Sequence, residues 1–184
     1  DWFSSVAFWY QTPPLPLEEA LPPVEKRVAP YRVLDPAALT SRADPPFLLI
    51  PSDLGLSYIP SIGDAWIEFD FDVEQDGRYQ LSGMFMYGIV GGIYQPYLDG
   101  NAIGGPLDFV IVNYNPGFAN LDLHELKAGK HTLRFESKAG RTSPMLRSEL
   151  PAINGFHFIR LFVLRLEDME GYHQKLNELV EKKK

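Results

Sequence analysis

The chain has 184 residues, of which 45% are hydrophobic and 13% aromatic, a composition that builds a sizeable core rather than a disordered segment. Its net charge of −7 gives little electrostatic support for nucleic-acid binding. It has no cysteine, which excludes disulfides, thiolate metal sites and thiol nucleophiles. No stretch is long and apolar enough to span a membrane as a helix, so we expect no membrane partner.

The chain begins with residues 1–11, which read DWFSSVAFWYQ and have the aromatic and β-branched content of a strand. A lone strand this apolar is not stable in water, so we expect it to pair with another part of the protein. There is no initiator methionine and no signal peptide. We therefore expect the segment to be the closing strand of a domain that lies upstream of residue 1.

Residues 12–63 are rich in proline, which removes strand hydrogen-bond donors and interrupts helices. We expect this stretch to be a long extended linker, or arm, that lies on a surface. The sequence suggests two short exceptions, a helical turn over residues 17–21 and a strand over residues 47–50.

Residues 64–166 show the alternation of a β-sandwich. Ile67, Phe69 and Phe71 alternate with acidic residues, and Asp76-Gly77 is a hairpin signal. Further short strands follow at 79–87, 93–98, 107–112, 121–126, 131–136 and 156–166, the last apolar on both faces as in a central strand. We therefore predict an all-β fold, an antiparallel β-sandwich or jelly roll. The predicted core comprises Ile67, Phe69, Tyr79, Leu81, Phe85, Leu133, Phe135, Phe158 and Phe162.

Residues 167–184 change to a helical period. Met169, Tyr172, Leu176 and Leu179 share one face, and Asp168 is a suitable N-cap. The pattern predicts a C-terminal amphipathic helix that docks either on the sandwich or on a neighbouring subunit.

The opening segment also carries a resemblance to a known family. Residues 1–11 resemble the closing strand of the domain-of-unknown-function 2961 proteins, which are grouped as glycoside hydrolase family 172. The resemblance implies a parent enzyme that acts on fructofuranosyl or arabinofuranosyl linkages and assembles as trimers or hexamers. It also implies an upstream catalytic domain as a partner, and an extracellular, periplasmic or cell-surface location.

A second resemblance covers residues 65–166. The Asp76-Gly77-Arg78-Tyr79 turn, Tyr97-Leu98-Asp99-Gly100 and the AGKHTLRF run of residues 128–135 are similar to galactose-binding-like jelly-roll modules appended to such enzymes. The loop of residues 137–144 departs from that pattern, so we assign it no ligand-binding role.

No catalytic residue is assigned to this chain. The resemblance places the family's catalytic glutamates upstream. Glu68, Asp70 and Asp72 lie on one strand face, roughly 6.5–7 Å between neighbours, which would suit a carboxylate pair. Alternating acids are more typical of a solvated strand face. Asp70 and Asp72 are the candidate ligands for a calcium ion, and we expect no other cofactor.

Sugar binding would need aromatic faces beside hydrogen-bonding side chains. The candidates are Trp66, Tyr94, Tyr97, Asn113, Tyr114 and Asn115. The alternative is that these residues pack under the linker or against another domain. The sequence therefore favours a non-catalytic module of a carbohydrate-active enzyme that serves oligo- or polysaccharide binding or assembly. A structural oligomerisation module without sugar binding is the alternative function.

Overall fold

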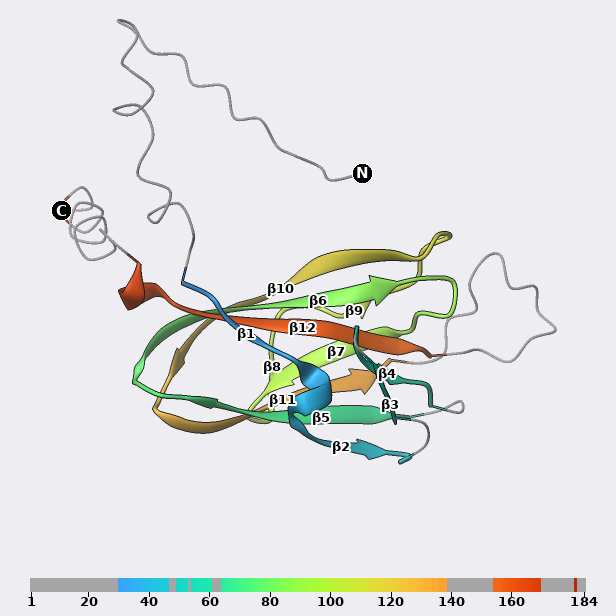
Figure 1. Cartoon of the computed structure of the whole chain (residues 1–184), viewed down its shortest axis with the longest axis horizontal. Coiled ribbons are helices and arrows are strands. Elements are labelled where there is room, and N and C mark those ends of the chain that lie inside the picture. Colours follow the sequence, from blue (N-terminus) through green and yellow to red (C-terminus); the bar gives the residue numbers. More distant parts are fainter. Residues whose placement is uncertain are drawn as a thin grey trace, which may run out of the picture.

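The computed structural model describes residues 30–46, 49–52, 54–60, 64–138, 154–169 and 181. Its strands form two antiparallel sheets packed face to face (Figure 1). The predicted all-β sandwich of the jelly-roll class is therefore confirmed. Among these residues, no helix is long and apolar enough to cross a bilayer.

The first sheet has β12 at its centre, as the apolar run of residues 156–166 predicts. The strand order is β10 (Asn115–Leu126), β6 (Gly77–Tyr87), β12 (Phe156–Arg165), β4 (Gly55–Tyr58) and β3 (Leu49–Ser52). The short strand β1 (Arg32–Leu34) also pairs with β12, further along it than β4 (Figure 1).

The second sheet has β11 at its centre. The order is β2 (Thr40–Asp44), β5 (Trp66–Val73), β11 (Gly129–Ser137), β7 (Ile93–Leu98) and β8 (Asn101–Ala102), with β9 (Leu107–Asp108) also pairing with β7. Pro96 predicts an edge position for β7, and β7 borders only these two-residue strands on its outer side. The described residues also include two short 3-10 helices, η2 (Pro36–Ala38) and η3 (Leu166–Asp168).

The core between the sheets is largely aromatic. The ring of Phe85 stacks on Phe158 with centroids 4.6 Å apart, and it packs against Phe109 at 4.8 Å. Phe135 and Phe156 join the same cluster at 4.9 Å. Alternation in β6 and β11 places Phe85 and Phe135 in this cluster, because every second residue over these parts of the strands is buried.

The prediction that residues 12–63 are linker is wrong for residues 32–58. These residues form β1, η2, β2, β3 and β4, and they pair with both sheets. The prolines are compatible with this because most lie between the strands, and Pro51 lies in β3, an edge strand. The sandwich therefore begins near Arg32 rather than at residue 64.

Phe162 is also corrected, since it faces outward rather than into the core. The pairing of β12 with β6 shifts register between Phe158 and Arg160. The shift resets the alternation, so that Leu161 and Val163 are buried and Phe162 points away from the core. Residues 1–11 and most of the predicted C-terminal helix lie outside the described residues.

Candidate functional site

Three loops meet at one end of the first sheet through close backbone contacts. The Gly88 amide donates to the Phe109 carbonyl at 2.9 Å, and the Gly155 amide donates to the Val90 carbonyl at 2.7 Å. A side chain at Gly91 would place its Cβ 2.2 Å from the Phe109 carbonyl oxygen. Glycine is therefore required for the three backbones to approach this closely.

We call Gly88, Gly91 and Gly155 the glycine platform, and the Tyr114 ring packs against it at Gly88. A Cβ on Gly88 would lie 2.6 Å from the Tyr114 ring, so the ring rests directly against the glycine. The side chain is nevertheless 61% exposed. It borders a pocket of about 180 Å³ that is open on one side and mainly apolar. Its lining includes Ser57, Ile59, Met86, Val90, Phe156 and His157.

Polar groups stand on one wall of this pocket. His157 Nδ1 lies 2.8 Å from the Ser57 hydroxyl, and its Nε2 lies 3.0 Å from the Leu54 carbonyl. These two contacts fix the ring plane and engage both imidazole nitrogens, so the Ser57 hydroxyl is the polar group of this pair that can contact a ligand in the pocket. An aromatic face with a few fixed polar groups is a common arrangement in small-ligand sites.

Asn154 adds a polar group directly before the pocket-lining Gly155. The residue is 0% exposed, and neither amide atom of its side chain has a hydrogen-bond partner among the described residues. Buried amides without a partner are rare in proteins, and such groups are commonly completed by a water or a ligand. A buried polar side chain therefore lies next in sequence to the pocket-lining Gly155, beneath the apolar surface of this end of the sandwich.

The structure divides the predicted sugar-binding residues among three locations. Asn113, Tyr114 and Asn115 are exposed together at the start of β10, beside the pocket. Tyr94 is 0% exposed, and its hydroxyl donates to the Asn154 carbonyl at 2.6 Å, so it belongs to the core and cannot stack on a sugar. Its inward orientation follows from alternation along β7.

Trp66 and Tyr97 lie on the outer face of the second sheet, far from Tyr114 in the fold. The guanidinium of Arg134 lies 4.1 Å from the Trp66 ring centroid, and the Lys138 ammonium lies 5.8 Å from that of Tyr97. Arg134 thus supplies the cover that an outward-facing indole needs. Both rings are half-buried and already partnered by cations.

Two carboxylates on the acidic face of β5 are paired with an arginine of the neighbouring strand β2. Arg42 on β2 donates to Glu68 at 2.6 Å and to both oxygens of Asp70 at 2.6 and 3.0 Å. The hydrogen bonds from Arg42 hold the pKa of Asp70 below its usual range. A carboxylate held ionised in this way is a poor general acid.

The same pairing argues against the predicted calcium site. Arg42 occupies the positions that a calcium ion would need at Asp70, while Asp72 is exposed. No group of three or more acidic or histidine side chains that could hold a metal occurs in the described part of the chain.

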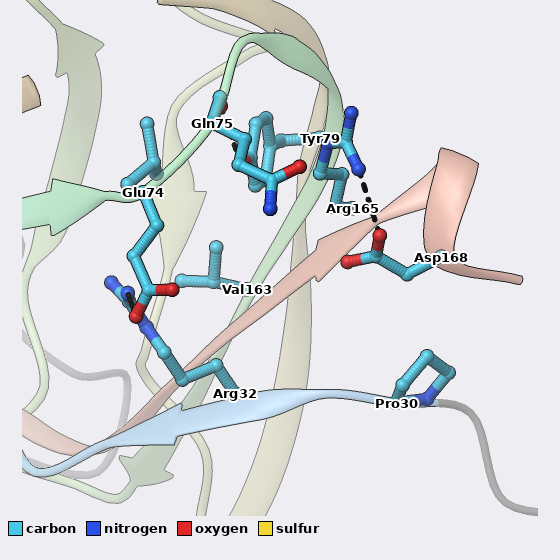
Figure 2. Close-up of a pocket in the computed structure, with 9 residues that line it drawn as sticks. Pro30, Arg32, Glu74, Gln75, Tyr79, Val163, Arg165 and Asp168 are labelled. Atoms are coloured by element: carbon cyan, nitrogen blue, oxygen red, sulfur yellow. Dashed lines mark hydrogen bonds and ion pairs between the residues drawn. The ribbon is translucent and has the colours of Figure 1, made fainter. Parts of the chain in front are cut away.

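A second pocket, of about 130 Å³, opens where β1, the β5–β6 turn and η3 meet (Figure 2). Its two arginines are already engaged: Arg32 lies 4.0 Å from Glu74, and Arg165 donates to Asp168 at 2.8 Å and to the Asp76 carbonyl at 3.0 Å. These contacts hold β1, the β5–β6 turn and η3 together at one end of the sandwich. The pocket therefore fits a structural brace better than a ligand site.

The fold has known counterparts among solved structures. A xanthan lyase from Paenibacillus is 15% identical, with a TM-score of 0.51 over 75% of this chain and 12% of the lyase. A family 35 carbohydrate-binding module from Clostridium thermocellum is 16% identical, with a TM-score of 0.51 over 73% of this chain and 98% of the module. No protein-family model matches the chain, and no curated protein matches it.

At these identities the likeness concerns the fold alone. The chain has the β-sandwich fold seen in a carbohydrate-binding module, and that module is matched over nearly its whole length. The resemblance of residues 1–11 to glycoside hydrolase family 172 is not matched by any family model and stays a prediction.

Sequence reasoning identified Tyr114 and its two asparagines but missed the rest of the pocket. Ser57 and His157 line the pocket from segments 100 residues apart that only the fold brings together. A local signal existed in the glycines at 88, 91, 92 and 155, which mark close backbone approach. From the sequence alone, without knowledge of which strands pair, those glycines predict ordinary turns.

Proposed function

We propose that this chain is a non-catalytic carbohydrate-binding module and that its sugar site is the Tyr114 pocket. The observation that carries the proposal is the Tyr114 ring, 61% exposed on a glycine platform at the rim of a pocket. Exposing an aromatic ring to water costs free energy, so a ring left exposed at a pocket rim favours a ligand that covers it. The shared fold with a carbohydrate-binding module supports the same reading.

The chemistry of the pocket suits a sugar. The apolar C–H face of a sugar ring would stack on Tyr114, and its hydroxyls would reach polar groups at the rim. The Ser57 hydroxyl, held by His157, keeps hydrogen-bonding capacity on one side, and Asn113 and Asn115 flank Tyr114 in the sequence. The described lining contains no aspartate, glutamate, lysine or arginine, so we expect the site to favour neutral sugars over uronic acids.

We further propose the finer assignment that the resemblance of residues 1–11 suggests. The module would serve a glycoside hydrolase that acts on fructofuranosyl or arabinofuranosyl linkages, outside the cytoplasm and in a trimer or hexamer. If so, the chain alone should not hydrolyse aryl fructo- or arabinofuranosides, and turnover by the purified chain would contradict the assignment.

Isothermal titration tests sugar binding directly. Fructo-, arabino-, xylo- and manno-oligosaccharides would be titrated into the native chain and into Tyr114→Ala. We expect one of these classes to bind, and we expect Tyr114→Ala to weaken binding by about tenfold or more, since stacking on an aromatic ring contributes on the order of 1–2 kcal/mol.

The matched control is Tyr97→Ala, which removes an equally large ring from the opposite sheet. It should bind like the native chain. No binding of any neutral oligosaccharide at millimolar concentration would exclude the proposed function, and an equal loss in both variants would exclude the proposed site.

A further inference from the structure

The outer face of the first sheet carries a contiguous apolar surface that the fold does not use. We call it the outer stripe; it consists of Tyr31, Val33, Met84, Phe118 and Phe162. The rings of Phe118 and Phe162 lie 5.5 Å apart, and Tyr31 meets Phe162 edge-on at 6.1 Å. Phe118 is 67% exposed and Val33 is 51% exposed. Exposed apolar surfaces of this kind mark contact sites.

We propose that the aromatic segment of residues 1–11 in the same chain docks on the outer stripe, rather than closing a domain upstream of residue 1. The segment contains Trp2, Phe3, Val6, Phe8, Trp9 and Tyr10, which cannot all remain in water at low cost. Its apolar side chains match the stripe, which presents aromatic and aliphatic groups of the same kind. Neither surface would then be left bare.

The course of the chain supports this occupant. The chain enters the described structure at Pro30, and the next residue, Tyr31, already belongs to the outer stripe through its contact with Phe162. Residues 12–29 can span about 55 Å when extended. The strands of this sheet cover only about 25 Å at the usual spacing of roughly 4.8 Å.

Tethering also favours this segment over a second copy of the chain. Because residues 12–29 tether the segment to the sandwich, its effective concentration at the stripe is about a millimolar. A second copy competes only at its bulk concentration, which is far lower in solution. The inference is independent of sugar binding, because the outer stripe and the Tyr114 pocket use different residues.

Paramagnetic relaxation in the full chain tests the docking. The chain lacks cysteine, so Asn120→Cys, at an exposed site beside the stripe, accepts a single spin label without altering the stripe. Trp2 and Trp9 provide indole N–H signals as reporters, and Trp66→Phe removes the remaining tryptophan. We expect the label to broaden both reporter signals strongly. A label at Thr40→Cys, on the opposite sheet, should leave them sharp.

Two further experiments decide whether residues 1–11 of the same chain or a second copy of the chain cover the outer stripe. Mixing spin-labelled and isotope-labelled copies should leave the reporters sharp if docking is within one chain; broadening there would show that a second copy covers the stripe and would overturn the proposal. Phe118→Ser, at an exposed position, should reduce the broadening in the singly labelled chain. Reporters that stay sharp with the label at residue 120 would also overturn it.

Discussion

At the scale of single residues, His131 is held between two acceptors. Its Nδ1 lies 2.7 Å from the Asp99 carboxylate, and its Nε2 lies 2.8 Å from the Lys127 carbonyl. Burial alone lowers the pKa of His131, but these hydrogen bonds and the Asp99 charge outweigh it and hold the pKa above its usual value. The arrangement therefore selects the protonated imidazole.

This shift predicts a pH-dependent stability. Because the folded pKa exceeds the unfolded one, the contribution is fully present below pH ~6.5 and disappears as pH rises through the folded value. Asp99→Asn should therefore lower the denaturation midpoint more at pH 5.5 than at pH 8.5, and it should lower the His131 pKa measured by NMR. An equal effect at both pH values would show that the pair does not titrate.

The placement of Tyr94 makes a second residue-scale prediction. Its buried hydroxyl donates to the Asn154 carbonyl at 2.6 Å. Tyr94→Phe should therefore lower the free energy of unfolding by about 1–2 kcal/mol in chemical denaturation. Tyr97→Phe, whose hydroxyl accepts a hydrogen bond from the exposed Lys138, serves as the matched control and should change it by less than about 0.5 kcal/mol. Equal effects would contradict the assignment of Tyr94 to the core.

At the scale of elements, the glycine contacts set the position of the loops around Tyr114. A methyl group at Gly91 would strike the Phe109 backbone, whereas at Gly105 it would meet nothing within 4 Å. We expect Gly91→Ala to destabilise the chain by about 2 kcal/mol or more and to weaken sugar binding. Gly105→Ala should do neither. A stable Gly91→Ala variant with native affinity would show that the loops can relax without consequence.

Much of the element-level structure could be predicted from sequence. The alternation of Ile67 and Phe69 with acids gave β5 and its buried face, and Asp76-Gly77 marked the hairpin that leads to β6. These signals are local, so they need no knowledge of partners. The Tyr114 pocket could be predicted only in part, because its other walls come from distant segments.

The predictions that failed concern features that depend on contacts with distant segments, which the local sequence does not reveal. Phe162 faces outward because of a register shift in the pairing of β12, which is set by the partner strand rather than by the sequence of β12. The strands within residues 32–58 are short and surrounded by proline, and their pairing with β12 and β5 stabilises them. The Trp66 ring is likewise covered by the guanidinium of Arg134, a residue 68 positions away in the sequence.

At the scale of the whole molecule, the strands before residue 64 are integral to the sandwich. They bury Leu56 and Tyr58 in the core and pack Leu34 and Ala43 against it. Fully burying a large apolar side chain contributes about 1.5–3 kcal/mol, and a domain has only about 5–15 kcal/mol of net stability. A chain that starts at residue 64 should therefore lose cooperative thermal unfolding, while one that starts at residue 30 should keep it.

The central claim is that a neutral sugar binds at the Tyr114 end of the sandwich. The most direct measurement is a two-dimensional amide NMR titration of the full chain with the oligosaccharide that binds in calorimetry. We predict that the largest shifts fall on Tyr114, His157 and the glycines at 88 and 91, with Trp66 and Tyr97 unmoved. Shifts centred on the outer face of the second sheet, or no shifts at millimolar sugar, would contradict the account.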